Sequence, residues 1–319
     1  MKLLHEYKNG NYIVSIYDDG TKIRETINRD DTYFDSEFPE NIDVCITKKC
    51  CINCPYCYES CTADGNHSKL FNSDRKPLFA FMNDLKPGTE FAINGNDLDH
   101  PELDMLLQFL KDKGVIANMT VNQVQFMRNI GKLKYYIDEQ LIYGLGVSYT
   151  ITDKKFINEL VKMGPNVVVH IIAGVHSYED IMELAGKDLK LLVLGYKDKG
   201  RGKAYKNRVF MSGNAHIVQV PIQIVELKEH INSLLQNFYV VSFDNLAIEQ
   251  LDIRNKFFKD NDEKWNLFYQ GDDGSHTFYV DLVNKKYAKN SLVEKQYDIG
   301  NLSLTDMFKK IKLEYNENN

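Results

Sequence analysis

The feature that most constrains this chain is the position of its cysteines, because all six lie between Cys45 and Cys61. A disulfide framework would distribute cysteines along the chain, since cross-links that close long loops restrict the unfolded chain most. Clustered thiols in a reducing compartment instead favour a metal centre. Cys45 alternates with Val44 and Ile46 in a strand-like run, so we expect it to behave as a small hydrophobic residue. The other five cysteines are the candidate ligands.

Composition places this centre in a globular protein of the cytoplasm. The 319 residues are 43% hydrophobic and 26% charged, which is far from the composition of disordered chains. A net charge of −6 argues against a protein that holds nucleic acid mainly through phosphate contacts. The N-terminus lacks the apolar stretch of a secretory signal, and the longest apolar run, near 167–175, is too short to span a bilayer. We therefore expect no membrane partner.

Short apolar runs alternate with amphipathic segments from Ile42 onward, which is typical of repeated βα units around a parallel sheet. A helix is expected from Glu102 to Lys113, where leucines recur at helical spacing. The fold class is therefore predicted as α/β. The expected strands are Ile42 to Ile46, Glu90 to Ile93, Asn118 to Val121, Leu145 to Tyr149, Val167 to Ile172 and Leu189 to Leu194.

The two ends of the chain depart from this alternation. Asn9-Gly10 and Asp19-Gly20 stand among alternating residues, which predicts an N-terminal ribbon of short antiparallel strands over residues 1–40. The βα units are assigned to a core over residues 41–235. Residues 236–319 contain strand-like pieces, notably Thr277 to Val283, and are expected to form an α+β elaboration packed on that core.

Three interpretations compete for the cysteine segment that directly follows the first predicted strand of the core. In the first, Cys50, Cys54 and Cys57 are separated by three and then two residues, so one loop could wrap an iron-sulfur cluster and leave its fourth iron without a protein ligand. An iron of that kind is free to bind a substrate or cofactor. This interpretation is favoured because spacing, position and neighbouring residues agree with it.

The other two interpretations use four cysteines. Cys51, Cys54, Cys57 and Cys61 match the spacing of a bacterial ferredoxin, which would make the chain an iron-sulfur electron carrier or sensor. Those ferredoxins place proline after the fourth cysteine, whereas Thr62 stands here. Structural zinc also takes four cysteines, usually as two pairs separated by a longer loop, and this chain lacks the second pair.

The sequence from Cys50 to Tyr58, with aromatic Tyr56 just before Cys57, resembles the CxxxCxΦC signature of the radical S-adenosylmethionine superfamily. The resemblance implies a partial (β/α)6 barrel, one [4Fe-4S] cluster on Cys50, Cys54 and Cys57, and S-adenosylmethionine chelated by the open iron. It implies an enzyme that cleaves S-adenosylmethionine reductively, taking one electron from a donor such as flavodoxin or ferredoxin. The resulting 5′-deoxyadenosyl radical would abstract hydrogen from a peptide, a nucleotide or a small molecule.

The same resemblance suggests contacts to the cofactor. Asn94-Gly95-Asn96 occupies the place of the family's Gly-Gly-Glu segment, which receives the amino group of S-adenosylmethionine. Only Gly95 matches strictly, so Asn96 would accept through its amide oxygen, with Asp97 as a candidate substitute. Tyr56 is expected beside the cofactor, and Ser148 at its ribose. Cys51 and Cys61 are expected to be spectators, and the lack of cysteines after Cys61 predicts no auxiliary cluster.

Substrate-pocket candidates follow from the general rule that active sites of α/β barrels gather at the carboxyl ends of the strands. His170 interrupts an apolar strand and is expected to face the cavity. Gly174, His176 and Tyr196 follow predicted strands and are further candidates. The basic, glycine-rich loop over 195–206 is expected to be solvated and flexible, with closure over an anionic substrate as the alternative.

Overall fold

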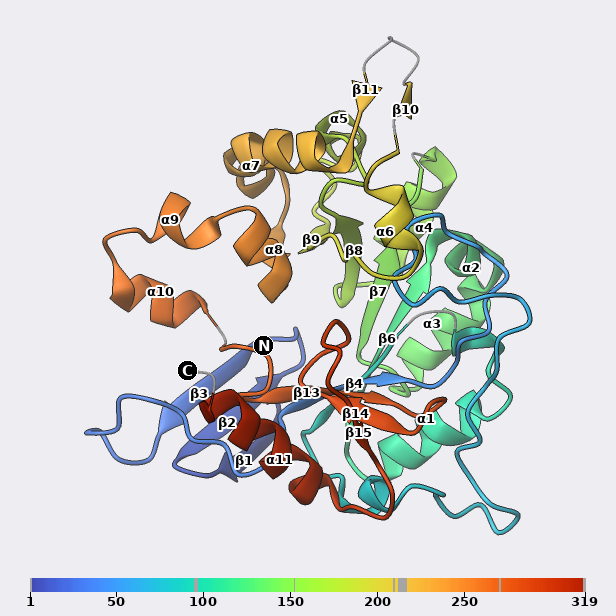
Figure 1. The fold of residues 1–319 in the computed structure, drawn as a ribbon, viewed down its shortest axis with the longest axis vertical. Coiled ribbons are helices and arrows are strands. Elements are labelled where there is room, and N and C mark those ends of the chain that lie inside the picture. The colour runs from blue at the N-terminus through green and yellow to red at the C-terminus, as the bar shows by residue number, and fades with distance from the viewer. Residues whose placement is uncertain are drawn as a thin grey trace.

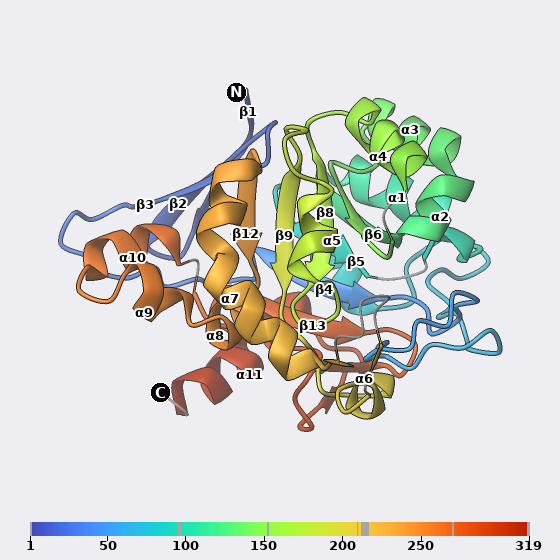
Figure 2. The same cartoon turned by 90° about the horizontal axis from the view of Figure 1, so that it is seen from above.

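The structure is a computed structural model that describes residues 2–94, 97–151, 153–208, 210–211, 217–269 and 271–317. Gly95 and Asn96, two of the predicted cofactor contacts, lie outside the described residues. Figures 1 and 2 show one large sheet with helices on its outer face and a small separate sheet at the N-terminus.

The large sheet has ten strands in the order β12-β9-β8-β7-β6-β5-β4-β13-β14-β15. The six strands from β9 to β4 are those predicted from the sequence, and they pair in parallel in consecutive order. The α/β class is therefore confirmed. These strands are β4 (Asn41–Cys45), β5 (Glu90–Ile93), β6 (Ile116–Asn122), β7 (Gly144–Ser148), β8 (Val167–Ile172) and β9 (Lys190–Leu194).

The C-terminal region extends this sheet at both edges. Strand β12 (Val240–Phe243) pairs in parallel with β9, and β13 (Thr277–Asp281) pairs in parallel with β4. Strands β14 (Lys286–Ala288) and β15 (Tyr297–Asp298) continue it in antiparallel fashion. The sequence predicts six parallel strands, whereas the described residues form eight, because two strands of the C-terminal region join the same sheet in parallel. The division at residue 235 stays a prediction.

Alternation along the strands explains how they are placed. In β8, Val167, Val169 and Ile171 are buried, while the residues between them are only partly buried. The same period of two in β4 buries Ile42 and Val44. The buried positions pack against the outer helices in one continuous hydrophobic core. The helices around the six central strands are α1 (Leu103–Asp112), α2 (Gln123–Arg128), α3 (Ile130–Asp138), α4 (Lys154–Lys162), α5 (Tyr178–Met182) and α7 (Val220–Asn237).

The N-terminal sheet lies at the amino ends of the parallel strands. It consists of β1 (Leu3–Asn9), β2 (Tyr12–Tyr17) and β3 (Lys22–Thr26), all antiparallel, as the sequence predicts. The turn between β2 and β3 meets the strands directly: Asn166 Nδ2 donates to the Asp18 carbonyl at 2.8 Å, and Lys190 Nζ donates to the Asp19 carbonyl at 3.1 Å. This end of the parallel sheet is therefore covered by the ribbon.

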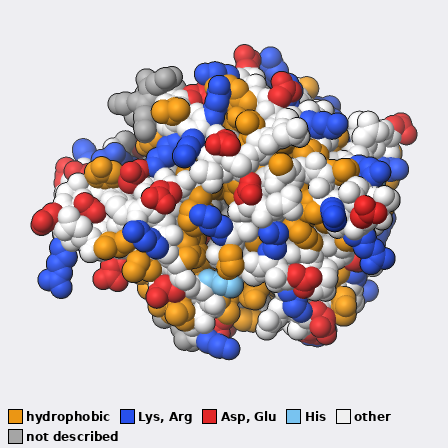
Figure 3. Space-filling model, turned by 90° about the horizontal axis from the view of Figure 1, so that it is seen from below, with side chains coloured by type: hydrophobic (Ala, Val, Ile, Leu, Met, Phe, Trp, Pro, Cys, Tyr) orange, Lys and Arg blue, Asp and Glu red, His pale blue; other side chains and the backbone are white. Residues whose placement is uncertain are grey.

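Shorter elements complete the chain, and no helix among the described residues is long and apolar enough to cross a bilayer. On the face drawn in Figure 3, Lys and Arg side chains are interspersed with Asp and Glu, so that face has no continuous basic surface. The remaining elements are η1 (Ala80–Asp84), η2 (Asp97–Asp99), α6 (Arg201–Tyr205), β10 (Phe210–Met211), β11 (Ile217–Val218), α8 (Asn245–Gln250), α9 (Ile253–Phe257), α10 (Asp262–Phe268) and α11 (Leu304–Glu317).

Candidate functional site

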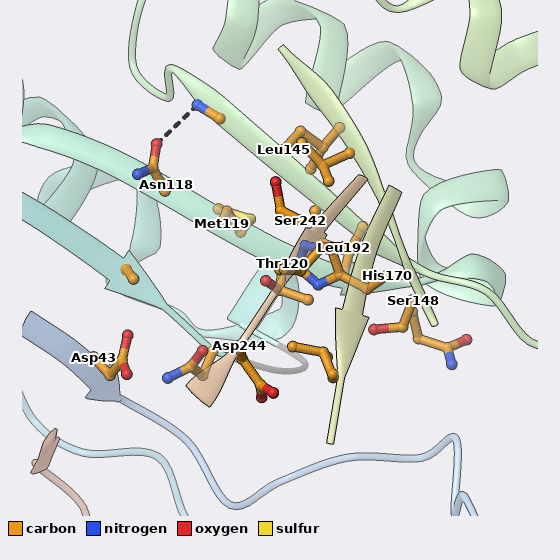
Figure 4. Close-up of a pocket in the computed structure, with 18 of the residues that line it drawn as sticks. Asp43, Asn118, Met119, Thr120, Leu145, Ser148, His170, Leu192, Ser242 and Asp244 are labelled. Carbon is orange, nitrogen blue, oxygen red and sulfur yellow. Dashed lines mark hydrogen bonds between the residues drawn. The ribbon is translucent and has the colours of Figure 1, made fainter. Parts of the chain in front are cut away.

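The inner face of the parallel sheet encloses a cavity of about 720 Å³. Residues from all eight parallel strands line it, so the sheet curves around the cavity rather than lying flat. The turn between β2 and β3 lines the cavity at the amino ends of the strands, and the cysteine segment lines it at the carboxyl ends. Figure 4 shows the side chains that reach into this space.

The cysteine segment leaves the carboxyl end of β4 and turns back over the cavity. Cys50, Cys54 and Cys57 line the cavity, as do Cys45 and Cys61, whereas Cys51 is exposed and does not. Main-chain hydrogen bonds hold the segment in place: the N–H of Cys50 donates to Thr62 O at 2.7 Å, and that of Cys57 donates to Cys54 O at 3.2 Å. The structure thus brings the three predicted thiols to one surface.

Hydrogen-bond donors surround these thiols. Main-chain N–H groups donate to Cys50 and Cys57, and Asn122 Nδ2 donates to Cys54 Sγ at 3.9 Å. Burial raises the pKa of Cys54 to about 11, with the neighbouring thiols adding to the shift. The Cys61 thiol donates to Cys57, which lowers the pKa of Cys57 and raises that of Cys61. Cys61 is therefore a direct neighbour of a predicted ligand, although the sequence suggested only a spectator.

Arg201, at the start of α6, ties the cysteine segment together. Its Nε donates to Cys54 O at 3.0 Å, and its Nη1 donates to Cys61 O at 2.9 Å. Its own main-chain N–H donates to Cys57 O at 3.1 Å. One residue thus contacts three cysteines through their carbonyl oxygens, and its charge also favours the thiolate forms of Cys54 and Cys57.

The loop around Arg201 is anchored to the cysteine segment, although Asp198 and Lys203 in it are exposed to solvent, as its composition suggested. Gly200 has φ +56°, and a Cβ there would lie 2.3 Å from the carbonyl oxygen of Tyr58. Tyr196 Oη donates to Gly202 O at 2.5 Å, which holds the loop to itself. The glycines permit close approach of two main chains rather than freedom of movement. The sequence did not predict these contacts, because it does not show which carbonyls a loop will meet, and the flexibility of the loop stays a prediction.

Other residues predicted to contact a cofactor lie around the same cavity. Tyr56 lines it and packs edge-on against Tyr205, with ring centroids 5.5 Å apart. Asn94 lines it directly after β5, and Ser148 lines it at the last position of β7. In the sheet register Ser148 is paired with Asn122 on one side and with His170 on the other. These side chains and the three thiols therefore share one compartment.

His170 reaches the middle of the cavity, as its place in an apolar strand predicted (Figure 4). The neighbouring strand makes room for it, because a Cβ on Gly146 would lie 2.3 Å from the imidazole Cε1. Burial lowers the pKa of His170 to about 4, so its ring is neutral near pH 7. Within the described part of the chain, the imidazole has no hydrogen-bond partner.

Two other pocket candidates are structural. His176 is 5% exposed and does not line the cavity. Its Nε2 donates to Tyr149 O at 3.0 Å, and its Nδ1 accepts from the N–H of Ile172 at 3.4 Å. Gly174 also lies outside the cavity lining, whereas Tyr196 belongs to it. The prediction for the first two was wrong, since a loop after a strand can turn outward and be satisfied by its own main chain.

Several cavity residues were missed from the sequence. Asp43 in β4 and Asp244 just after β12 both point into the cavity (Figure 4). Asp43 could have been found, because it lies two residues before Cys45 and a strand places such residues on the same face. Asp244 could not, since the short strand before it gave no signal of belonging to the same sheet.

A compact polar cluster lies beside the cysteine segment. Cys45, Glu59 and Asp281 have potential ligand atoms within 4.8 Å of one another. Lys48 pairs with both carboxylates, at 3.1 Å from Asp281, and Tyr279 Oη donates to Glu59 at 3.1 Å. The Lys48 ammonium group thus balances part of the negative charge of Glu59 and Asp281. Cys45 is buried, as expected, but its surroundings are charged rather than purely apolar.

Comparisons with known proteins do not assign a family to the chain. No family model matches it, and no curated protein is a significant match. Function must therefore be inferred from the side chains around the cavity.

Proposed function

We propose that this chain is a radical S-adenosylmethionine enzyme. The observation that supports this most is the shared location of the three thiols and the polar side chains expected to meet the cofactor. All of them line one cavity, at the carboxyl ends of consecutive parallel strands, where α/β barrels carry their active sites. The thiols are those of Cys50, Cys54 and Cys57, and the other residues are Tyr56, Asn94 and Ser148.

The residues present fit a [4Fe-4S] cluster in their chemistry. Thiolates are the usual ligands of such clusters, and hydrogen bonds to the sulfurs tune them. Here the main chain donates to Cys50 and Cys57, and Asn122 donates to Cys54. The guanidinium of Arg201 offsets part of the negative charge that several thiolates would gather.

The protein's part in the reaction would be to position and to shield. When bound, the cluster and S-adenosylmethionine supply reductive cleavage to a 5′-deoxyadenosyl radical that abstracts hydrogen from the substrate. The inner face of the sheet presents Leu192 and Leu194 to the cavity, and these apolar side chains would exclude water from it. A one-electron donor such as flavodoxin or ferredoxin would be the partner, in the cytoplasm.

The arrangement of strands supports the same proposal. Six parallel strands in consecutive order are what a partial (β/α)6 barrel requires, and β4 precedes the cysteine segment directly. The flanking strands β12 and β13 extend the wall around the cavity.

The alternative is an electron carrier that binds its cluster through four cysteines. In the ferredoxin-like set Cys51 would be a ligand, but Cys51 is exposed and lies away from the cavity that Cys54, Cys57 and Cys61 line. The contact between the thiols of Cys61 and Cys57 is the one observation in favour of a fourth thiol ligand. The two proposals are separated by what Cys51 and Cys61 contribute.

The test is anaerobic reconstitution with iron and sulfide, followed by dithionite and S-adenosylmethionine, with 5′-deoxyadenosine measured by chromatography. We expect the product from the natural protein and its loss, with most of the iron, in Cys50→Ser, Cys54→Ser and Cys57→Ser. Cys51→Ser and Cys61→Ser are matched controls that should keep both. The electron carrier would be favoured if each serine variant of Cys51, Cys54, Cys57 and Cys61 lost the cluster and S-adenosylmethionine caused no spectral change in the natural protein.

A further inference from the structure

The part of the cavity wall nearest the two added strands carries two carboxylates that form no ion pair with any residue the structure describes. Asp43 lies in β4, next to β13, and Asp244 directly follows β12. Both side chains point into the cavity in Figure 4. The two residues thus stand on either side of the seam between β12 and β13, which are not paired with each other.

Each carboxylate has an oxygen left open. Asp43 Oδ1 accepts a long hydrogen bond of 3.4 Å from Asn41 Nδ2, and its Oδ2 has no partner in the described chain. Asp244 Oδ1 accepts from the N–H groups of Gly195 and Ala247, at 2.8 and 2.7 Å, and its Oδ2 is likewise open among the described residues. Burial raises the pKa of both side chains.

The nearest cation does not neutralise them by contact. Lys197 lines the same part of the cavity and acts electrostatically on both carboxylates. Its Nζ donates to Ser291 Oγ at 3.1 Å and lies 4.0 Å from the centre of the Tyr58 ring. Within the described chain it forms no ion pair with Asp43 or Asp244. Asp273 adds negative charge to the same neighbourhood.

A metal ion is a poor occupant for this place. No third histidine, cysteine or carboxylate of the described chain lies close enough to complete a metal-binding group with Asp43 and Asp244. An organic cation fits better, because its N–H groups would satisfy the open oxygens and the ring of Tyr279 also lines the cavity there. His170, which is enclosed and has no hydrogen-bond partner in the described chain, offers a neutral polar contact in the same cavity.

We infer that the substrate carries a protonated amine or a guanidinium group, which binds to the carboxylates of Asp43 and Asp244 at the seam between β12 and β13. This inference rests on the proposed function in one respect, because it takes the bound molecule to be the substrate of that reaction. The cation site itself does not require radical chemistry. The site joins Asp43 of β4, one of the six consecutive strands, to Asp244, which follows strand β12 of the C-terminal region.

The test is ligand-observed fluorine NMR on the reconstituted, full-length protein with three probes of matched shape. These are 4-fluorobenzylamine, 4-fluorobenzyl alcohol and 4-fluorobenzoate. We expect the amine to bind about tenfold more tightly than the alcohol, as a charge-assisted hydrogen bond implies, and the benzoate to bind least. Equal affinity for amine and alcohol would overturn the inference.

Three variants locate the binding. Asp43→Asn and Asp244→Asn should each lower the amine affinity about tenfold and leave the alcohol affinity unchanged. Asp18→Asn is the matched control, because Asp18 lines the ribbon end of the same cavity and should have no effect. An amine affinity that survives both substitutions would overturn the inference. Thermal unfolding of each variant verifies folding, and Asp43→Asn should not lower the melting temperature, since a buried unpaired charge is removed.

The cofactor and the substrate are then distinguished. S-adenosylmethionine is itself a cation and could compete for the same carboxylates. If these bind the substrate instead, adding S-adenosylmethionine should leave the amine probe bound. Displacement of the probe would assign the carboxylates to the cofactor and overturn the inference. Formation of 5′-deoxyadenosine is measured on the same preparation. If it forms without any preference for the amine, only the substrate inference fails. If the protein prefers the amine probe but forms no 5′-deoxyadenosine, the proposed function fails and the cation site remains.

Discussion

The two ends of the parallel sheet are built on opposite principles. At the amino ends, under the N-terminal ribbon, buried charge is matched by opposite charge. Glu40 is fully buried there, and Arg24 approaches it with two donors, Nε to Oε1 at 2.9 Å and Nη2 to Oε2 at 3.0 Å. Lys22 pairs with both Glu40 and Glu90, and Tyr12 Oη donates to Glu40 at 2.5 Å. The buried charges of this end are therefore paired without a ligand, although the buried Tyr7 Oη, Thr89 Oγ1 and Asn166 Oδ1 have no hydrogen-bond partner among the described residues.

At the carboxyl ends the same kinds of side chain are left unmatched. His170 has no hydrogen-bond partner in the described chain, and Asp43 and Asp244 have no ion pair there. Three thiols gather without a disulfide. Polar groups that line a cavity are accessible to a ligand, so we expect a ligand to satisfy the ones at this end. The contrast separates residues that serve stability from residues that serve binding.

Removal of the charge at the ribbon end should have the largest effect on stability. Glu40→Gln leaves Arg24 and Lys22 without their buried partner, which typically costs about 3 to 5 kcal/mol in the free energy of unfolding. Denaturant unfolding measures this loss, while the iron content of the folded fraction should stay unchanged. If the variant lost iron without losing stability, Glu40 would serve the iron site and not the stability of the fold, which would contradict the contrast between the two ends.

The pH dependence of the natural protein sharpens the same point. Burial alone would raise the pKa of Glu40, but Lys22 and Arg24 outweigh it and lower that pKa to about 2. A carboxyl group with a depressed pKa stabilises the folded state above its unfolded value of 4.5, and this contribution is lost as the pH falls from 4.5 towards 2. The Glu40→Gln variant should lack this part of the acid transition.

Buried histidine should give a second acid effect of about 3 kcal/mol. Burial lowers the pKa of His176 from 6.5 to about 4, so the unfolded chain binds a proton first as the pH falls. Stability is therefore full above pH 6.5 and falls between pH 6.5 and 4. His176→Gln should flatten the slope of unfolding free energy against pH in that window. Burial lowers the pKa of His170 and of His276 to about 4 as well, so His176→Gln should remove only part of the slope. An unchanged slope would contradict a contribution from His176.

The smallest effect on stability is expected for Arg201, a charged residue that has hydrogen-bond partners at the carboxyl ends of the strands. Arg201→Gln removes the hydrogen bonds from its guanidinium to Cys54 O and Cys61 O, which hold the cysteine segment and not the hydrophobic core. We expect a small loss of global stability with a clear loss of iron retention on dialysis against a chelator. Lys203→Gln, an exposed change in the same helix, is the matched control and should retain iron as the natural protein does.

Sequence patterns predicted the parts of the fold that follow from local periodicity. β5 and β8 begin and end where the apolar runs do. Cys50, Cys54 and Cys57 line one cavity, and their joint binding of a cluster stays a prediction. What escaped prediction depends on contacts between distant segments. β12 has only four residues and is a strand because β9 lies beside it. The hold of Arg201 on the cysteine segment uses main-chain carbonyls, which every residue has and no pattern reveals.

The seam between β12 and β13 has one more consequence. The wall is joined there by side-chain and loop contacts, such as Asn245 Nδ2 with Asp273 Oδ1 at 2.8 Å, instead of by a ladder of strand pairing. Exchange of the segment from 240 to 281 would therefore alter one side of the cavity and leave the register of the six consecutive strands intact. A scaffold organised in this way could acquire a new specificity while inheriting its reactive centre unchanged.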